Sequence, residues 1–163
     1  MKMTMLLSTA FIACLACPSA FAVTDTVTIN VSGTLTRPPC TITSSKTLTA
    51  NFGSVRYDEI DSAAMIDIPV TMTCPANSSM SISIKAPVTY QNAPTKAHAG
   101  MSGLGYSLIL NSDSTAVNLT GVKRTLTNQS GAVDLSMKAK LLTVGTVTEG
   151  SFSASAVISI EYL

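Results

Sequence analysis

Side chains that could carry out catalysis are scarce in this chain. It has a single histidine, His98, no tryptophan, and only 12% charged residues. His98 lies among small residues, so we interpret it as an incidental exposed side chain. The glycines and serine of residues 100–103 do not have the spacing of a nucleophile elbow, and no third glycine completes a dinucleotide-binding turn. We therefore expect neither an enzyme nor a bound cofactor.

Beyond residue 22 the chain has no long apolar run and no excess of positive or negative charge. Residues 1–22 have a charged start at Lys2, an apolar run too short to span a membrane, and an Ala-Phe-Ala cleavage site at 20–22. We interpret this segment as a secretory signal peptide. Once it is removed, nine Lys and Arg residues balance nine Asp and Glu residues. The absence of a basic stripe argues against nucleic acid as a partner.

The acidic residues give no clear metal site. Asp58, Glu59 and Asp61 cluster at an expected turn, but the twelve-residue ligand pattern of a calcium loop is missing. Such a cluster is typical of a solvated loop. We expect no bound metal.

The cysteines indicate a disulfide. Cys14 and Cys17 leave with the signal peptide, so Cys40 and Cys74 remain as a lone pair in an exported chain. A disulfide is the usual outcome in an oxidising compartment. A metal site or a redox pair would be expected to show C-x-x-C spacing or nearby histidines, and neither occurs.

Nearly every patterned segment alternates with a period of two residues, which predicts strands rather than helices. Pro69 removes one ladder donor and should lie at an edge or a bulge. Residues 75–77 are expected to form a turn, 87–103 an irregular connection, 111–131 a polar turn-rich segment, and 143–150 a hairpin connection. The expected strands are residues 47–52, 65–74, 80–84, 104–110, 133–141 and 152–162.

Seven or so short strands with regular turn signals favour an all-β, immunoglobulin-like β-sandwich. The fit is partial, because the chain has no Trp and its cysteines would join the first strand to the next. The last expected strand also ends the sequence at Leu163, where a complete sandwich should have one more strand. We therefore expect an incomplete sandwich that lacks its last strand.

Two alternating segments, near the ends of the mature chain, have no obvious partner. A half-buried strand at a chain end usually pairs with something. The front segment is either the first strand of its own sandwich or a strand offered to another molecule, and the stiff pair Pro38-Pro39 favours the second interpretation. In the front segment, residues 26–35, the alternate positions that form the apolar face are Val27, Ile29, Val31, Gly33 and Leu35. In the last segment, residues 152–163, they are Phe152, Ala154, Ala156, Ile158, Ile160 and Tyr162.

The order of these features resembles pilin subunits of the chaperone–usher type, most of all the small tip or adaptor subunits of type 1 and P-like fimbriae. The resemblance covers essentially the whole mature chain. It rests on the signal peptide, the arm with Gly33, the segment 38–42, the strand end Phe52-Gly53, the Cys74 strand and the penultimate Tyr162. It implies three parts: signal peptide 1–22, N-terminal donor-strand extension 23–36, and pilin domain 37–163.

The resemblance also implies a mechanism. Such pilins lack the last strand of their fold, a periplasmic chaperone lends one, and at the outer-membrane usher the arm of the next subunit replaces it. Val27, Ile29, Val31, Gly33 and Leu35 would be the donor residues. Residues 152–163 would line the groove and contact the chaperone, with the Leu163 carboxylate held by basic groups. The product would be a fimbria on the bacterial surface. Two alternatives stay open: a receptor-binding adhesin surface on the pilin domain itself, and an exported enzyme or inhibitor.

Overall fold

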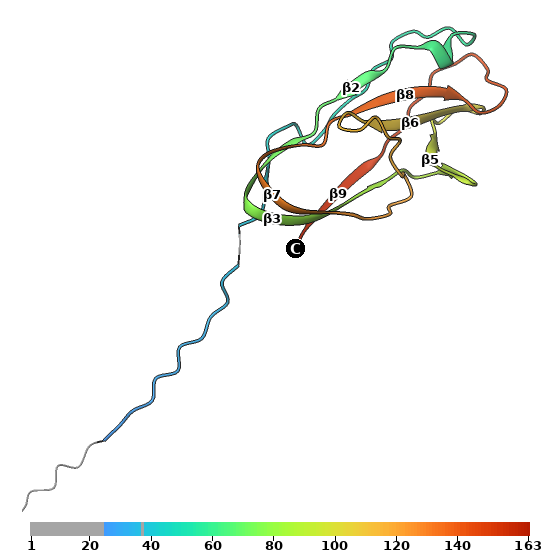
Figure 1. Ribbon diagram of the computed structural model, residues 1–163. Coiled ribbons are helices and arrows are strands. Elements are labelled where there is room, and N and C mark those ends of the chain that lie inside the picture. Colours follow the sequence, from blue (N-terminus) through green and yellow to red (C-terminus); the bar gives the residue numbers. More distant parts are fainter. Residues whose placement is uncertain (1–24, 37) are drawn as a thin grey trace, which may run out of the picture. The chain divides into compact units, whose positions relative to one another are not determined.

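The computed structural model describes residues 25–36 and 38–163 of the chain (Figure 1). The expected signal peptide, residues 1–22, lies outside the described residues. Contacts divide the chain into one unit that ends at Leu35 and a second that runs from Thr36 to Leu163. The described residues of the first unit form no helix or strand, whereas the second unit contains all the strands.

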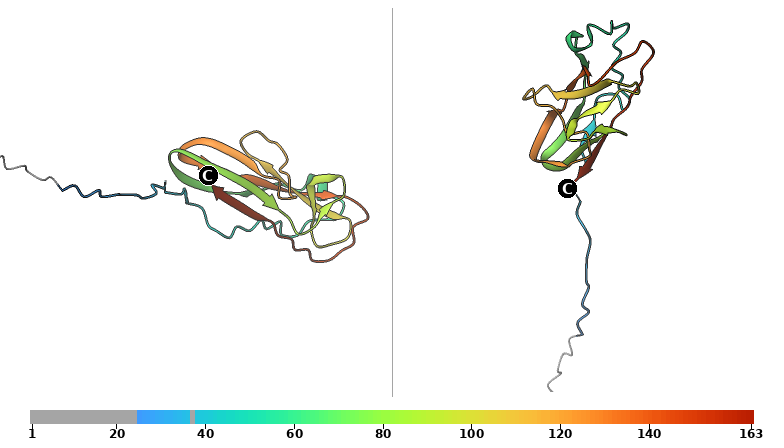
Figure 2. Two further views of the ribbon diagram at one scale, coloured as in Figure 1. Left: turned by 90° about the horizontal axis from the view of Figure 1, so that it is seen from below. Right: turned by 90° about the vertical axis from the view of Figure 1, so that its right-hand side faces the viewer.

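The second unit is a β-sandwich of two antiparallel sheets, seen as two layers in Figures 1 and 2. In the first sheet, β3 lies between β7 on one side and both β1 and β9 on the other. The second sheet has the order β2-β8-β6-β5-β4. The strands are β1 (Thr41–Ile42), β2 (Ile66–Ile68), β3 (Thr71–Lys85), β4 (Thr89–Tyr90), β5 (Ala93–His98), β6 (Leu104–Leu110), β7 (Arg124–Asp134), β8 (Met137–Thr143) and β9 (Val157–Tyr162).

Helical structure in the described residues is limited to the single 3₁₀ turn η1 (Ile60–Ser62). The turn is held against β8 because the Asp61 carboxylate accepts a 2.9 Å hydrogen bond from the backbone N–H of Thr143. This bond holds the pKa of Asp61 below its ordinary value.

Two packed antiparallel sheets with almost no helix confirm the predicted all-β, immunoglobulin-like architecture.

Alternation along β3 sends its even-numbered apolar side chains into the space between the sheets. Ile84 joins a large core cluster with residues of β6 and β8, such as Leu108 and Leu141. A smaller cluster surrounds the disulfide and contains Cys40, Met72, Cys74, Met80 and Val133.

The predicted strand 65–74 is broken at Pro69. The chain passes there from the second sheet, where β2 pairs with β8, to the first, where β3 pairs with β7. Proline has no backbone N–H, so the break costs no ladder bond at that position. The Ser136 hydroxyl accepts a hydrogen bond of 3.1 Å from the backbone N–H of Val70 at the crossing. Pro69 thus lies between two strands, as its chemistry requires.

Three sequence-based expectations about turns and loops were wrong. Residues 75–77 do not end a strand, because β3 runs on through a register shift with Asn77 at a φ of 59°. Residues 87–103 contain β4 and β5, and residues 111–131 contain most of β7. These strands carry mainly polar or small side chains, and β7 is largely exposed. Backbone hydrogen bonds alone hold such strands in place. Because their side chains do not alternate between apolar and polar, the sequence pattern did not reveal them.

The predicted disulfide joins Cys40 to Cys74, which are 34 residues apart. It lies where β1 pairs with β3 through Thr41 and Thr73. The bridge therefore fixes the start of the domain to the beginning of its longest strand, β3.

Replacing Cys40 and Cys74 together with serine should destabilise the domain. Closing a loop of this length stabilises a fold by about 3–4 kcal/mol through the entropy of the unfolded chain. That is a large part of a typical domain's stability, so the yield of folded protein should fall markedly. Non-reducing mass spectrometry and thermal unfolding measure the effect. Two free thiols in correctly folded wild-type protein would contradict the assignment.

Candidate assembly site

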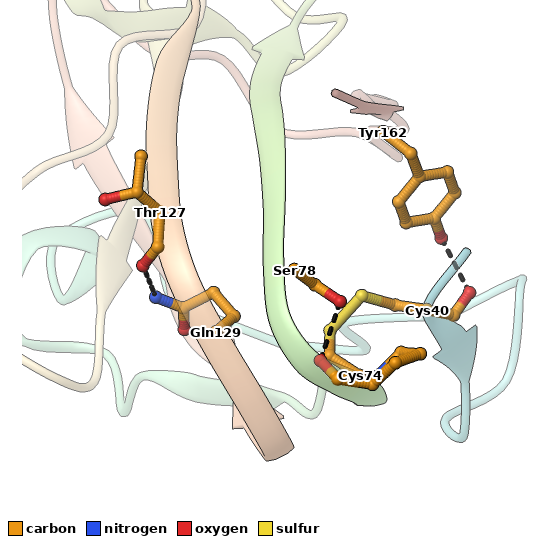
Figure 3. The surroundings of a disulfide bond; sticks show 7 residues. Cys40, Cys74, Ser78, Thr127, Gln129 and Tyr162 are labelled. Atoms are coloured by element: carbon orange, nitrogen blue, oxygen red, sulfur yellow. Dashed lines mark hydrogen bonds between the residues drawn. A yellow bond between two sulfur atoms is a disulfide. The ribbon is translucent and has the colours of Figure 1, made fainter. Parts of the chain in front are cut away.

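Two segments far apart in the sequence are joined at both of their ends. At one end, the Tyr162 hydroxyl donates a hydrogen bond of 2.9 Å to the backbone carbonyl of Cys40 (Figure 3). At the other end, the rings of Phe52 and Phe152 lie 6.5 Å apart in a tilted contact. Segment 40–52 therefore runs antiparallel to segment 152–162. We call the strip between these two segments the acceptor slot.

No strand lies in the acceptor slot in the described part of the chain. One edge of β9 pairs with β3, from Met80 opposite Tyr162 to Lys85 opposite Val157. A bond from the Leu163 N–H to the Ser79 carbonyl extends that ladder by one residue. The other edge of β9 pairs with no strand, and neither residues 46–52 nor 151–156 belong to one. The two segments are thus joined at their ends by side-chain contacts and lack the backbone ladder that a complete sheet would have.

Residues 47–52 were predicted as a strand, and the structure does not form one. Their side chains nevertheless alternate as in a strand: Leu48, Ala50 and Phe52 are half-buried against the main core, while Thr49 and Asn51 are exposed. The apolar pattern was read correctly, but the pairing partner that would make a ladder is absent. The same holds for residues 152–156, which precede β9.

The predicted groove residues lie on the other side of the slot with mixed exposure. Phe152, Ala156 and Ile158 pack partly buried against the main core, and Ile160 packs against the disulfide cluster. Ala154, Tyr162 and Leu163 are exposed. The slot is therefore bordered by apolar side chains that a full sandwich would cover.

Segment 151–156 is held from the inside of the sandwich although it has no ladder. The Tyr106 hydroxyl donates a hydrogen bond of 2.8 Å to the Ser155 carbonyl. Burial raises the pKa of Tyr106, so this donor stays protonated. Gly100, at a φ of +82°, approaches the Ser153 carbonyl so closely that a β-carbon would overlap it. These contacts keep the segment extended beside the slot.

A cavity of about 390 Å³ opens at the Phe152 end of the slot. Sequence reasoning missed most of its walls, because they come from loops and from strand ends that meet only in the fold. Its apolar lining residues are Val55, Ile60, Met101, Leu104, Leu141, Val147 and Phe152.

The arm, residues 25–36, is extended and forms no strand. The side chains of Val27, Ile29, Val31 and Leu35 are 88%, 80%, 92% and 103% exposed. A β-carbon on Gly33 would meet nothing within 4 Å. Large apolar side chains gathered in one exposed segment form the kind of surface that interaction sites present.

Other chemistry is sparse in the residues that the structure describes. No group of three or more His, Cys, Asp or Glu side chains there could hold a metal ion. Within the acidic cluster, Asp58 is paired with Arg56 at 2.7 Å. His98 stacks on the Tyr90 ring at 3.7 Å between centroids. None of the helices in the described range is long and apolar enough to cross a membrane.

Several solved structures share this fold at low sequence identity. The P pilus rod subunit PapA has a TM-score of 0.64 at 19% identity, with 77% of this chain and 100% of PapA covered. A chaperone–usher pilus structure gives 0.63 at 18% identity, covering 90% of this chain and 100% of that one. The P pilus adaptor subunit PapF gives 0.58 at 18% identity, covering 77% and 97%. No curated protein sequence matches the chain.

A protein-family model described as "Fimbrial protein" matches residues 29–163. The match extends from the arm through the disulfide and both sides of the acceptor slot to Leu163. Proteins of this family are structural rather than enzymatic. The chain belongs to the fimbrial protein family and is a structural subunit of a fimbria.

Proposed function

We propose that this subunit polymerises by donor-strand exchange. Its acceptor slot receives an extended strand from a neighbouring subunit, and its own arm enters the slot of the next one. The observation that carries the proposal is the slot itself. Segments 40–52 and 152–162 are tied at both ends, bordered by apolar side chains, and share no ladder. An added strand would satisfy both unpaired edges and cover the apolar surface at once.

The arm has the pattern that the slot requires. In a strand that joins one sheet of a sandwich, alternate side chains point inward to the core, so Val27, Ile29, Val31 and Leu35 would enter the core together. Gly33 shares their parity and lets the arm backbone approach the neighbour closely at that point. Each large apolar side chain that becomes buried contributes about 1.5–3 kcal/mol relative to its exposed state.

A periplasmic chaperone and the outer-membrane usher are the further partners that we propose. An open slot presents an unpaired strand edge and apolar side chains, which is an aggregation hazard. A chaperone strand paired to the free edge of β9 would cover it until the subunit is assembled. The chain would then be secreted through the periplasm and displayed on the cell surface as a minor or adaptor subunit. Residues 1–22 would be the signal peptide, residues 23–36 the donor arm, and residues 37–163 the pilin domain.

Hydrogen exchange tests strand insertion directly. A synthetic peptide of residues 25–36, added to domain 37–163, should slow amide exchange in segments 46–52 and 152–162 together, because the new strand lies between them. A peptide with Ile29→Asp is the matched control and should give no protection. Protection confined to another part of the domain would refute the slot as the site of insertion.

A further inference from the structure

The ladder between β3 and β9 shows which backbone groups of β9 face the acceptor slot. The Leu163 N–H donates to the Ser79 carbonyl and continues that ladder in register. Backbone groups of successive residues point to opposite edges of a strand, so the odd-numbered residues of β9 face β3. The even-numbered residues of β9 therefore direct their N–H and carbonyl groups into the slot.

The same reasoning applies to β1 on the other side of the slot. The Thr43 N–H donates to the Thr71 carbonyl, in register with the ladder between β1 and β3. Odd-numbered residues there face β3, so the Cys40 carbonyl faces the slot. This carbonyl accepts the hydrogen bond of 2.9 Å from the Tyr162 hydroxyl, and the Tyr162 side chain extends from β9 towards it (Figure 3).

Tyr162 therefore spans one end of the slot. Its side chain starts on β9 and ends on a backbone carbonyl of the opposite segment. A donor strand that continued past this point would need the Cys40 carbonyl for its own ladder and would have to displace the phenol. We call this contact the Tyr162 clasp.

Two registers keep residues 27–35 of a donor arm within the slot. A donor that runs antiparallel to β9, as β3 does on the other edge, places its inward, odd-numbered residues opposite the even-numbered residues of segment 152–162. Its register therefore changes in steps of two residues. Residues 27–35 fit within the segment with Val27 opposite either Tyr162 or Ile160. Both registers bury the same face of the arm, so alternation does not choose between them.

The register with Val27 opposite Ile160 leaves the Tyr162 clasp closed. It also places Leu35 opposite Phe152, beside the cavity of about 390 Å³. The other register opens the clasp, places Leu35 opposite Ala154 and leaves the cavity uncovered. Retention of one hydrogen bond and burial of apolar surface at the cavity both favour the first register.

We propose that Tyr162 fixes the register of the donor strand. The clasp ends the new ladder at Ile160, and the chain that precedes Val27 leaves the slot there. This inference rests on the proposed strand exchange and adds to it the residue that decides how far the strand can slide. Tyr162 thus acts as a stop for the donor strand in addition to bordering the slot.

Disulfide capture measures the register. Thr28 of the donor points outward, opposite Ser159 in the proposed register and opposite Glu161 in the other. Cα atoms of such pairs, which share no hydrogen bonds, lie about 4.5 Å apart, a distance that a disulfide can bridge. A peptide of residues 25–36 with Thr28→Cys is oxidised with the mature chain, whose own arm carries Ile29→Asp so that only the peptide donates. We expect at least about fivefold more product with Ser159→Cys than with Glu161→Cys.

Variants of Tyr162 test its role in this preference. Tyr162→Ala should bring the two yields close to equality, and Tyr162→Phe, which keeps the ring but loses the hydrogen bond, should lower their ratio. If the alanine variant does not fold, the phenylalanine variant decides alone. Tyr90→Phe is the matched control: it removes a hydroxyl that bonds to the Leu104 carbonyl in the other sheet, and it should leave the ratio unchanged.

The possible outcomes separate this inference from the exchange on which it rests. Equal yields in the chain with Tyr162 intact, more product with Glu161→Cys, or a ratio that neither Tyr162 variant alters would overturn the stop while strand insertion stands. No product at either position, together with no protection of the slot from hydrogen exchange, would refute strand insertion and this inference with it.

Discussion

A domain that lacks residues 23–36 should gain stability when a copy of residues 26–36 is attached after Leu163. Segment 152–162 ends beside Cys40, so a strand joined there by a short flexible linker folds back antiparallel to β9 and enters the acceptor slot. Burial of Val27, Ile29, Val31 and Leu35 should raise the free energy of unfolding by several kcal/mol after the cost of ordering the strand. The melting temperature should rise by about 10 °C or more.

The matched control carries Ile29→Asp and Val31→Asp in the attached copy. Its linker and length are the same, so any stabilisation from the extra chain alone would remain. We expect its melting temperature to stay close to that of the domain with no added strand, and both should aggregate more readily than the fusion. If the domain without any donor strand is already as stable as the fusion, the sandwich is complete and the proposed exchange is wrong.

How far the sequence predicted the structure depended on whether a strand carries apolar alternation. β6 was predicted at its observed bounds because Leu104, Tyr106 and Leu108 alternate into the core. β7 was missed because its eleven residues are mostly exposed and polar, and only its ladder with β3 makes it a strand. Alternation reports burial of one face, not pairing of an edge.

The same distinction explains what could be predicted of the candidate site. The alternating apolar residues of 47–52 and 152–162 were recognised in the sequence, although only the second segment was predicted to line a groove and the first was predicted simply as a strand. The absence of a ladder along residues 47–52 and 152–156 could not be found that way, because alternation reports which face of a strand is buried and not whether its edge is paired. The cavity beside Phe152 was not predicted either, since Met101, Leu141 and Val147 come from separate elements.

Charging the inward face of the arm should block incorporation of this subunit into fimbriae. Ile29→Asp or Val31→Asp would place an unpaired carboxylate between the sheets of the neighbour, at a cost of several kcal/mol. Substituting valine for Gly33 should act through steric overlap with the neighbour's backbone. The subunit's own domain should still fold and bind its chaperone, because these side chains are exposed in the free chain.

Asn30→Asp is the matched control, since Asn30 has the opposite parity and would face away from the core of the neighbour. It adds the same charge to the same arm and should incorporate almost normally. The measurements are the amount of each variant in purified fimbriae and the yield of its chaperone complex from the periplasm. A loss of folded subunit and of chaperone complex with Ile29→Asp would mean that the arm belongs to the core of its own domain. The donor assignment of residues 26–35 would then have to be abandoned.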